Sequence, residues 1–282
     1  MPKFDREIIV ACELAREAGA ILLAHYHSPF LVEQKINALQ EIEEVTAADR
    51  EANDLIVRGL LTEFPDDGIL AEESKDTERR LKKDRVWLID PMDGTKNFIQ
   101  RDGDFAVQIG LAVDGQVVAG VVYQPERDTL YRAVSGEGAW IETKDAAARR
   151  MSVSTLTDPG EMVLASSRSH RSPRMERVVN LFGFKREVRR GSVGVKIGLI
   201  TEQQADLYLH LSPGTKQWDT CAPEIILREA GGRLTDLFGQ PLRYNDVRID
   251  NRNGIVATNG VVHDKIIETL APLLKEFGRQ PV

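Results

Sequence analysis

The chain has 282 residues, of which 42% are hydrophobic and 29% are charged, and its formal net charge is −7. This length suffices for a large core, in one domain or in two packed subdomains. The acidic balance argues against a general nucleic-acid-binding protein, but not against an anionic substrate whose charge is balanced by bound cations. Two isolated cysteines, no signal-peptide core and no membrane-length apolar stretch lead us to expect a cytoplasmic protein without a membrane or nucleic-acid partner.

The first half of the chain combines helices with a run of strands. Apolar residues recur at helical spacing in two segments, which predicts helices over 5–26 and 47–64. A charged stretch over 77–84 is expected to form a solvated, mobile loop. Strict alternation and tight-turn residues predict a meander of strands. Its strands, with a short one before them, are expected over 69–71, 105–113, 117–123, 130–134 and 139–142.

The second half of the chain alternates strands with helices. The strands are expected over 162–166, 184–188, 205–211 and 254–258. The helices are expected over 173–182, 193–202, 219–230 and 263–277. A polar, alanine-rich segment at 144–150 predicts a boundary between an N-terminal subdomain, 1–150, and a C-terminal subdomain, 151–282. The fold class is therefore α/β, with helices and sheets in layers.

The most informative segment of the chain is Asp90-Pro91-Met92-Asp93-Gly94-Thr95, which follows the apolar run 87–89. The pattern predicts a strand that ends at a carboxylate, turns sharply and opens a helix. Proline fixes one backbone angle between the two aspartates, and glycine leaves room for a phosphate beside free backbone N–H groups. The alternative is an ordinary Asp-Pro-x-Asp-Gly turn without chemistry.

Further acidic residues stand at the ends of predicted elements. Glu72 and Glu73 follow a short strand, and Asp219 opens a helix. Asp49 lies in the first turn of the second helix, where Thr46-x-x-Asp49 also matches a capping box. Clustered carboxylates either take up protons or hold cations. Ligands that are all oxygen favour magnesium or manganese over zinc.

Four motifs together resemble the inositol monophosphatase superfamily. Segment 90–98 (DPMDGTKNF) resembles its first signature, and 218–222 (WDTCA), followed by 229–232 (EAGG), resembles its second. Segment 71–74 (AEES) resembles the acidic turn of the family, and 46–49 its Thr-x-x-Asp element. The motifs occur in the family's order along nearly the whole chain. The resemblance implies the sugar-phosphatase fold, with alternating αβαβα layers.

The resemblance also implies the metal ligands. Glu72, Asp90 and the carbonyl of Met92 would hold one Mg²⁺, and Asp90 would bridge to a second ion bound by Asp93 and Asp219. A third, weaker ion would lie near Glu72, and Mn²⁺ is a possible substitute. Paired metals activate water, orient a phosphate and neutralise the leaving oxygen.

The implied reaction is direct hydrolysis of a phosphate monoester. Thr95 and Asp49 would form a hydrogen-bonded pair that helps to deprotonate the attacking water, and Glu72 would act beside them. No covalent enzyme intermediate is needed. A small phosphorylated molecule is therefore the expected partner. By the same resemblance, lithium inhibition and a homodimer are expected.

The sequence indicates the type of reaction more clearly than it indicates the substrate. Lys96, the segment 166–170 (SSRSH) and the segment 191–196 (GSVGVK) resemble the 3′(2′),5′-bisphosphate nucleotidase branch of the superfamily. Asn97-Phe98 instead matches the form usual in inositol monophosphatases, which remain the main alternative, and a non-catalytic scaffold is a third reading. A second phosphate needs cations outside the metal site. The residues predicted to bind substrate are Gly94, Thr95, Arg168, His170, Ser192, Lys196 and Asp219.

Overall fold

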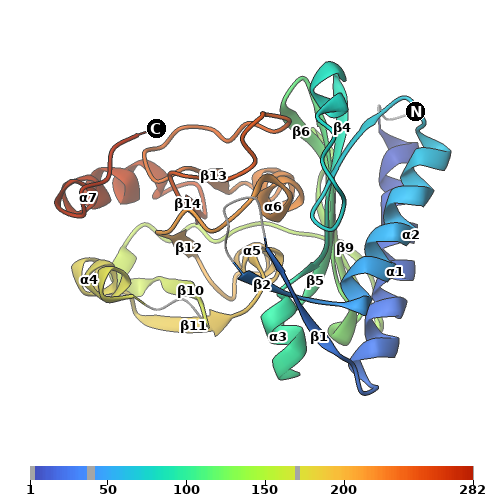
Figure 1. Cartoon of the computed structure of the whole chain (residues 1–282). Coiled ribbons are helices and arrows are strands. Elements are labelled where there is room, and N and C mark those ends of the chain that lie inside the picture. Colours follow the sequence, from blue (N-terminus) through green and yellow to red (C-terminus); the bar gives the residue numbers. More distant parts are fainter. Residues whose placement is uncertain (1–3, 37–41, 169–171, 282) are drawn as a thin grey trace.

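The computed structural model describes residues 4–36, 42–168 and 172–281, and these form five alternating layers of helix and sheet (Figure 1). One outer layer holds α1 (Asp5–Tyr26) and α2 (Ala47–Glu63). The middle layer holds α5 (Val193–Thr201) and α6 (Gln217–Glu229). The other outer layer holds α4 (Pro173–Phe182) and α7 (His263–Glu276). A sheet lies between each pair of helical layers, which confirms the predicted αβαβα fold.

The larger sheet has seven strands in the order β3-β4-β5-β6-β7-β8-β9. Only β3 and β4 pair in parallel, and the other neighbours are antiparallel. The predicted Asp114-Gly115 hairpin is confirmed, with φ values of 51° and 77° that suit a tight turn. The strands are β3 (Gly68–Ala71), β4 (Arg85–Asp93), β5 (Ala106–Val113), β6 (Gln116–Gln124), β7 (Thr129–Val134), β8 (Gly138–Thr143) and β9 (Ala146–Arg150).

The smaller sheet has five strands in the order β11-β10-β12-β14-β13. Strands β11, β10 and β12 are parallel, so their carboxyl ends meet at one edge of the sheet. That edge carries Ser167, Arg190 and His210. The strands are β10 (Val163–Ser167), β11 (Arg186–Arg190), β12 (Leu207–His210), β13 (Arg233–Thr235) and β14 (Ile255–Thr258).

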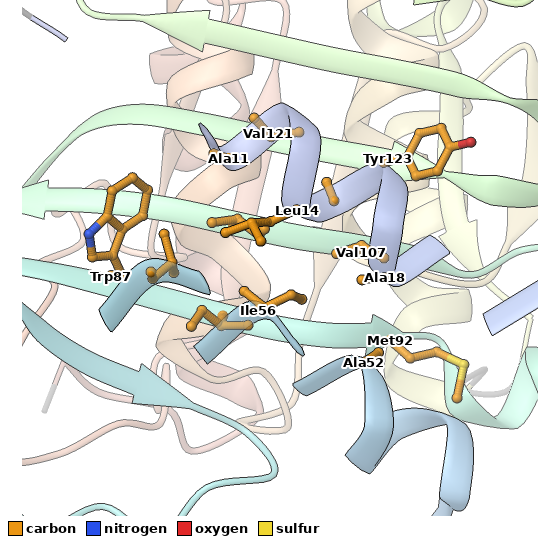
Figure 2. Packing of buried hydrophobic residues seen from close by; sticks show 14 of the residues in the cluster. Ala11, Leu14, Ala18, Ala52, Ile56, Trp87, Met92, Val107, Val121 and Tyr123 are labelled. Atoms are coloured by element: carbon orange, nitrogen blue, oxygen red, sulfur yellow. The ribbon is translucent and has the colours of Figure 1, made fainter. Parts of the chain in front are cut away.

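Small residues bring helices close to both faces of the larger sheet. On the outer face, Ala11, Ala18 and Ala52 are fully buried and let α1 and α2 pack against the apolar side chains of the sheet (Figure 2). On the inner face, a Cβ added at Gly120 would lie only 2.8 Å from Cα of Ala222. Helix α6 therefore rests directly on the strands, which fixes the position of its first turn.

Several elements differ from the sequence prediction. The hairpin β1 (Val32–Ile36) and β2 (Ile42–Thr46), and strands β9 and β13, were not expected. The prediction of a solvated loop over 77–84 is wrong at its centre. A short 3-10 helix spans Arg79–Lys82, and Arg80 is only 2% exposed because Asp76, Asn245 and the carbonyl of residue 246 accept its hydrogen bonds.

The two sheets use separate parts of the chain, because the larger one spans 68–150 and the smaller one 163–258. Helix α6 nevertheless packs against the larger sheet. The boundary near residue 150 between two subdomains stays a prediction. None of the helices within the described residues is long and apolar enough to cross a membrane.

A buried histidine joins β13 and β14 and makes stability depend on pH. His263 lies 2.9 Å from the Thr235 hydroxyl and 3.0 Å from the Thr258 hydroxyl. Burial lowers the pKa of His263 from 6.5 to about 4. The positive charge of Arg233 adds to this effect, and the negative charge of Asp264 opposes it. The folded state therefore keeps this imidazole neutral where the unfolded chain binds a proton, so its stabilising effect is lost as pH falls from 6.5 to 4.

We expect the free energy of unfolding to fall between pH 7 and pH 5 by about 2 kcal/mol more in the wild type than in His263→Gln. Carboxylates that titrate in this range act in both proteins, so the difference between them isolates the imidazole. Urea unfolding at the two pH values measures it. An equal fall in both proteins would contradict the assignment.

Candidate active site

The opening motif forms the end of β4 and the start of α3 (Thr95–Gln100). The strand was expected to end at Asp90. It instead continues to Asp93, through an irregularity in its pairing with β5. The backbone N–H of Met92 donates to Asp90 Oδ1 at 2.9 Å, which fixes this turn. Gly94 has a φ of 105°, and a Cβ there would lie 2.6 Å from the carbonyl oxygen of residue 104. Only glycine suits this position.

Four carboxylates meet at this turn although they come from three separate elements. Asp90 and Asp93 lie on β4, Glu72 follows β3, and Asp219 lies in the first turn of α6. Burial raises the pKa of Asp90 well above its ordinary value, and the charges of the other three raise it further. Burial and the charges of Asp93 and Glu72 likewise raise the pKa of Asp219 well above its ordinary value. Protons or cations must therefore neutralise this cluster.

A lysine from the unpredicted hairpin supplies part of that neutralisation. Lys35 Nζ donates to Glu72 Oε1 at 3.0 Å and also contacts Glu73. Burial raises the pKa of Glu72 to about 7, and the charge of Lys35 opposes this rise. Nothing in the sequence pattern around Lys35 indicated this contact. The ion pair with Lys35 makes Glu73 a partner of Glu72 at this site.

The donor set fits magnesium, with carboxylates, one backbone carbonyl, and no histidine or cysteine. Among the described residues no group of three or more acids, histidines or cysteines is already arranged around one point. Asp93 Oδ2 accepts three hydrogen bonds. Their donors are Gln108 at 2.5 Å, Ser192 at 2.6 Å and the N–H of Gly194 at 3.0 Å.

The predicted pair of Thr95 and Asp49 is in place. Thr95 Oγ1 lies 3.1 Å from Asp49 Oδ1 and 3.3 Å from the carbonyl oxygen of Met92. Asp49 Oδ2 accepts from both the backbone N–H and the hydroxyl of Thr46, at 2.7 and 2.8 Å. Asp49 therefore has both expected roles. Its Oδ2 caps the helix through Thr46, and its Oδ1 pairs with Thr95. Burial is the main cause that raises the pKa of Asp49 to about 6.

Glu72, Asp93, Asp219 and Thr95 line a cavity of about 240 Å³. It brings together most of the residues that we expected to bind substrate. Its polar lining includes Glu72, Asp93, Gly94, Thr95, Lys96, Ser167, Ser192, Lys196, His210 and Asp219. Anionic groups and lysines thus share one small space.

Ser192 and Lys196 hold the start of α5 in this cavity. Ser192 adopts a positive φ of 50° and caps the helix by accepting from the N–H of Val195 at 3.1 Å. Lys196 is only 3% exposed. Its Nζ donates to the carbonyl of Gly191 at 3.2 Å and lies 4.8 Å from the centre of the Tyr208 ring. Burial lowers the pKa of Lys196 to about 8, although nearby aspartates oppose this.

Arg168 and His170, two of the residues predicted to bind substrate, are not among the described residues that line the cavity. Arg168 is paired with acids, at 2.9 Å from Asp104 Oδ2 and 3.5 Å from Asp102 Oδ2. His170 lies outside the described residues. Asp104 was not predicted as a partner, because a single acid before a strand is common on protein surfaces.

Comparisons with known proteins agree on one family. The model of the inositol monophosphatase family matches residues 4–275. The 3′(2′),5′-bisphosphate nucleotidase CysQ of Escherichia coli is 36% identical over 236 residues, 83% of this chain and 92% of that protein. The Nus factor SuhB of the same species is 31% identical over 236 residues, 82% of this chain and 85% of that protein.

Solved structures have the same fold over nearly the whole chain. CysQ from Bacteroides thetaiotaomicron matches with a TM-score of 0.75 and 31% identity, over 91% of this chain and 98% of that one. An IMPase from Thermotoga maritima matches with a TM-score of 0.79 and 28% identity, over 99% and 100% of the two chains. The resemblance predicted from the four motifs is thereby confirmed, and the chain belongs to the inositol monophosphatase family.

Proposed function

We propose that this chain is a magnesium-dependent phosphatase that hydrolyses 3′-phosphoadenosine 5′-phosphate to AMP and phosphate. The observation that carries the proposal is the shared cavity, where a carboxylate cluster suited to cations lies beside Lys96 and Lys196. Metal ions at the carboxylates suit the phosphate that reacts, and lysines suit a second phosphate that does not. The similarity to the CysQ nucleotidases supports the same substrate class.

The metal-binding residues of this proposal are those implied by the motifs. Glu72, Asp90 and the Met92 carbonyl would hold one Mg²⁺, and Asp90, Asp93 and Asp219 would hold the second. A third ion near Glu72 and replacement by Mn²⁺ belong to the same proposal. Bound magnesium supplies positive charge for the phosphate and lowers the pKa of water. Glu72, one of these residues, also pairs with Lys35 at 3.0 Å.

The side chains of the chain itself position and deprotonate the water. Thr95 Oγ1 takes a proton from the water while its own proton passes to Asp49, whose second oxygen is held by Thr46. The water oxygen forms a bond to phosphorus, and the bond from phosphorus to the ribose 3′ oxygen breaks. That oxygen leaves with a proton from solvent. Gly94 and Thr95 line the cavity where the reacting phosphate would lie.

Phosphate release from a panel of esters tests this function. We expect kcat/KM for 3′-phosphoadenosine 5′-phosphate to exceed that for inositol 1-phosphate by at least about tenfold, which corresponds to about 1.4 kcal/mol of binding to the second phosphate. EDTA should abolish both activities, and added Mg²⁺ should restore them. Equal or reversed rates would overturn the nucleotidase and favour the inositol monophosphatase.

Three further properties stay predictions from the family resemblance, namely a cytoplasmic location, a homodimer and inhibition by lithium. The free cysteines Cys12 and Cys221 are consistent with a reducing compartment. A purely structural role is not supported by the chain, because each carboxylate expected as a ligand is present. Phosphate release by the purified protein distinguishes an enzyme from a scaffold.

A further inference from the structure

A buried aspartate lies next to the active-site cavity and belongs to none of the motifs. Asp104 precedes β5 and is 2% exposed. Its Oδ2 accepts from the backbone N–H of Gly191 at 3.0 Å and from Arg168 at 2.9 Å. Arg190 Nε lies 3.7 Å from its Oδ1. The field of Asp104 also favours the charged form of Lys196. One buried carboxylate thus faces three cationic side chains.

Arg190 is the least satisfied member of this group. It ends β11 in register with Ser167, which lines the cavity, and it directly precedes Gly191 and Ser192, which line it too. Its Nε is buried and has no hydrogen-bond partner among the described atoms. At 3.7 Å from Asp104, Nε is too distant for a good hydrogen bond. A buried donor in this state calls for an acceptor from elsewhere.

The charges of this group favour an anion. Arg168, Arg190 and Lys196 face Asp104, and Asp102 adds one further negative charge beside Arg168. Asn97 holds Asp102 in place through a hydrogen bond of 2.7 Å. Three positive and two negative side chains give this group a net positive charge, and its chain neighbours Ser167 and Gly191 line the cavity. Guanidinium groups bind phosphate oxygens in pairs, which lysine does not.

We propose that Arg190 binds the phosphate that is not transferred, and that Asp104 is the positioning residue that holds Arg190 and Arg168 next to the segments that line the cavity. This inference rests on the proposed function, because only a bisphosphate substrate brings a second phosphate. Lys196 lines the cavity, and its Nζ donates to the carbonyl of Gly191, the residue that follows Arg190.

The substitution Arg190→Met tests the contact with matched substrates. Adenosine 3′-phosphate has the same base and the same reacting phosphate as 3′-phosphoadenosine 5′-phosphate, but lacks the 5′-phosphate. We expect Arg190→Met to raise KM for the bisphosphate by about 10- to 100-fold, the range for a hydrogen bond to a charged group. Its kcat, and both constants for adenosine 3′-phosphate, should change less than about twofold, because that substrate does not reach the site.

The control variant is Arg189→Met, one residue earlier on the same strand. Arg189 is 51% exposed and its ion pair is with Glu187 at 3.5 Å, not with Asp104. Arg189→Met removes the same positive charge as Arg190→Met, so it controls for long-range electrostatic effects on KM. We expect its KM for both substrates to stay near the wild-type values. Equal effects of the two variants would overturn the assignment of Arg190.

Asp104→Asn tests the positioning role. We expect KM for the bisphosphate to rise while KM for adenosine 3′-phosphate stays unchanged, and Asp104→Glu to restore part of the difference. A loss of kcat on both substrates would show a merely structural role and contradict the positioning. If Asp104→Asn does not fold, calorimetric binding of AMP against adenosine to Arg190→Met decides the phosphate contact.

The outcomes separate this inference from the proposed function. If the wild type shows no preference for the bisphosphate over adenosine 3′-phosphate, both are wrong. If it shows the preference and Arg190→Met retains it, the function stands and this inference is wrong. Loss of the preference in Arg190→Met alone supports both.

Discussion

Asp90→Asn should lose at least about 1,000-fold in kcat/KM, since it removes the charge shared by two proposed metal ions. The substitution is nearly isosteric. The amide oxygen can still accept from the N–H of Met92, and the uncharged amide no longer repels the neighbouring carboxylates. The loss should therefore reflect cation binding rather than a changed backbone. Phosphate release at saturating Mg²⁺ measures it.

Thermal unfolding gives an independent readout of the same variant. Without metal, Asp90→Asn should unfold at the wild-type temperature or above it, because one buried and repelled carboxylate is gone. The rise in unfolding temperature on addition of Mg²⁺ should be much smaller than in the wild type. Asp54→Asn, on the exposed face of α2, is the matched control for both measurements. An active Asp90→Asn with an unchanged response to Mg²⁺ would refute the bridging role.

Much of the fold was predictable because local patterns and tertiary structure agree. The first helix was expected over 5–26 and is Asp5–Tyr26, since its apolar stripe matches the buried face. The helix expected over 173–182 is Pro173–Phe182, with Ser172 as its cap and Gly183 after it. Such helices carry start and stop signals within their own sequence.

The missed strands depend on partners that are distant or polar. Strand β9 consists of alanines and arginines that are all exposed, and only its pairing with β8 makes it a strand. In the β1–β2 hairpin, charged residues separate the few apolar ones, so alternation is weak. Strand β13 has three residues and gains its order from β14. Pairing energy of this kind is not visible in a single segment.

The site shows the same division between local and distant information. The order of elements placed the acids at strand and helix ends, and the structure brings Glu72, Asp90, Asp93 and Asp219 together as expected. Counter-ions were not predictable in this way. Lys35 reaches the cluster from a hairpin, and Arg168 pairs with acids that follow α3. Each contact joins segments whose separation in sequence carries no signal.

Thr95→Val should lower kcat by about 100- to 10,000-fold, the usual contribution of a positioned proton-transfer group. Valine has nearly the shape of threonine but neither accepts a proton from water nor donates to Asp49. Thr95→Ser keeps the hydroxyl and should retain most of the activity, so it is the matched control. KM should change much less than kcat in Thr95→Val, because the hydroxyl acts on the water rather than on the substrate.

The double variant Asp49→Asn with Thr95→Val separates a proton relay from two independent effects. If Asp49 acts only through Thr95, its substitution should cost little in a protein that already lacks the hydroxyl. Thr46 would still bond the remaining amide oxygen, so the start of α2 should persist and be visible in an unchanged unfolding temperature. Additive losses would instead assign Asp49 a role of its own. The present geometry favours the relay, because Asp49 Oδ1 contacts Thr95 while Oδ2 is committed to the helix cap.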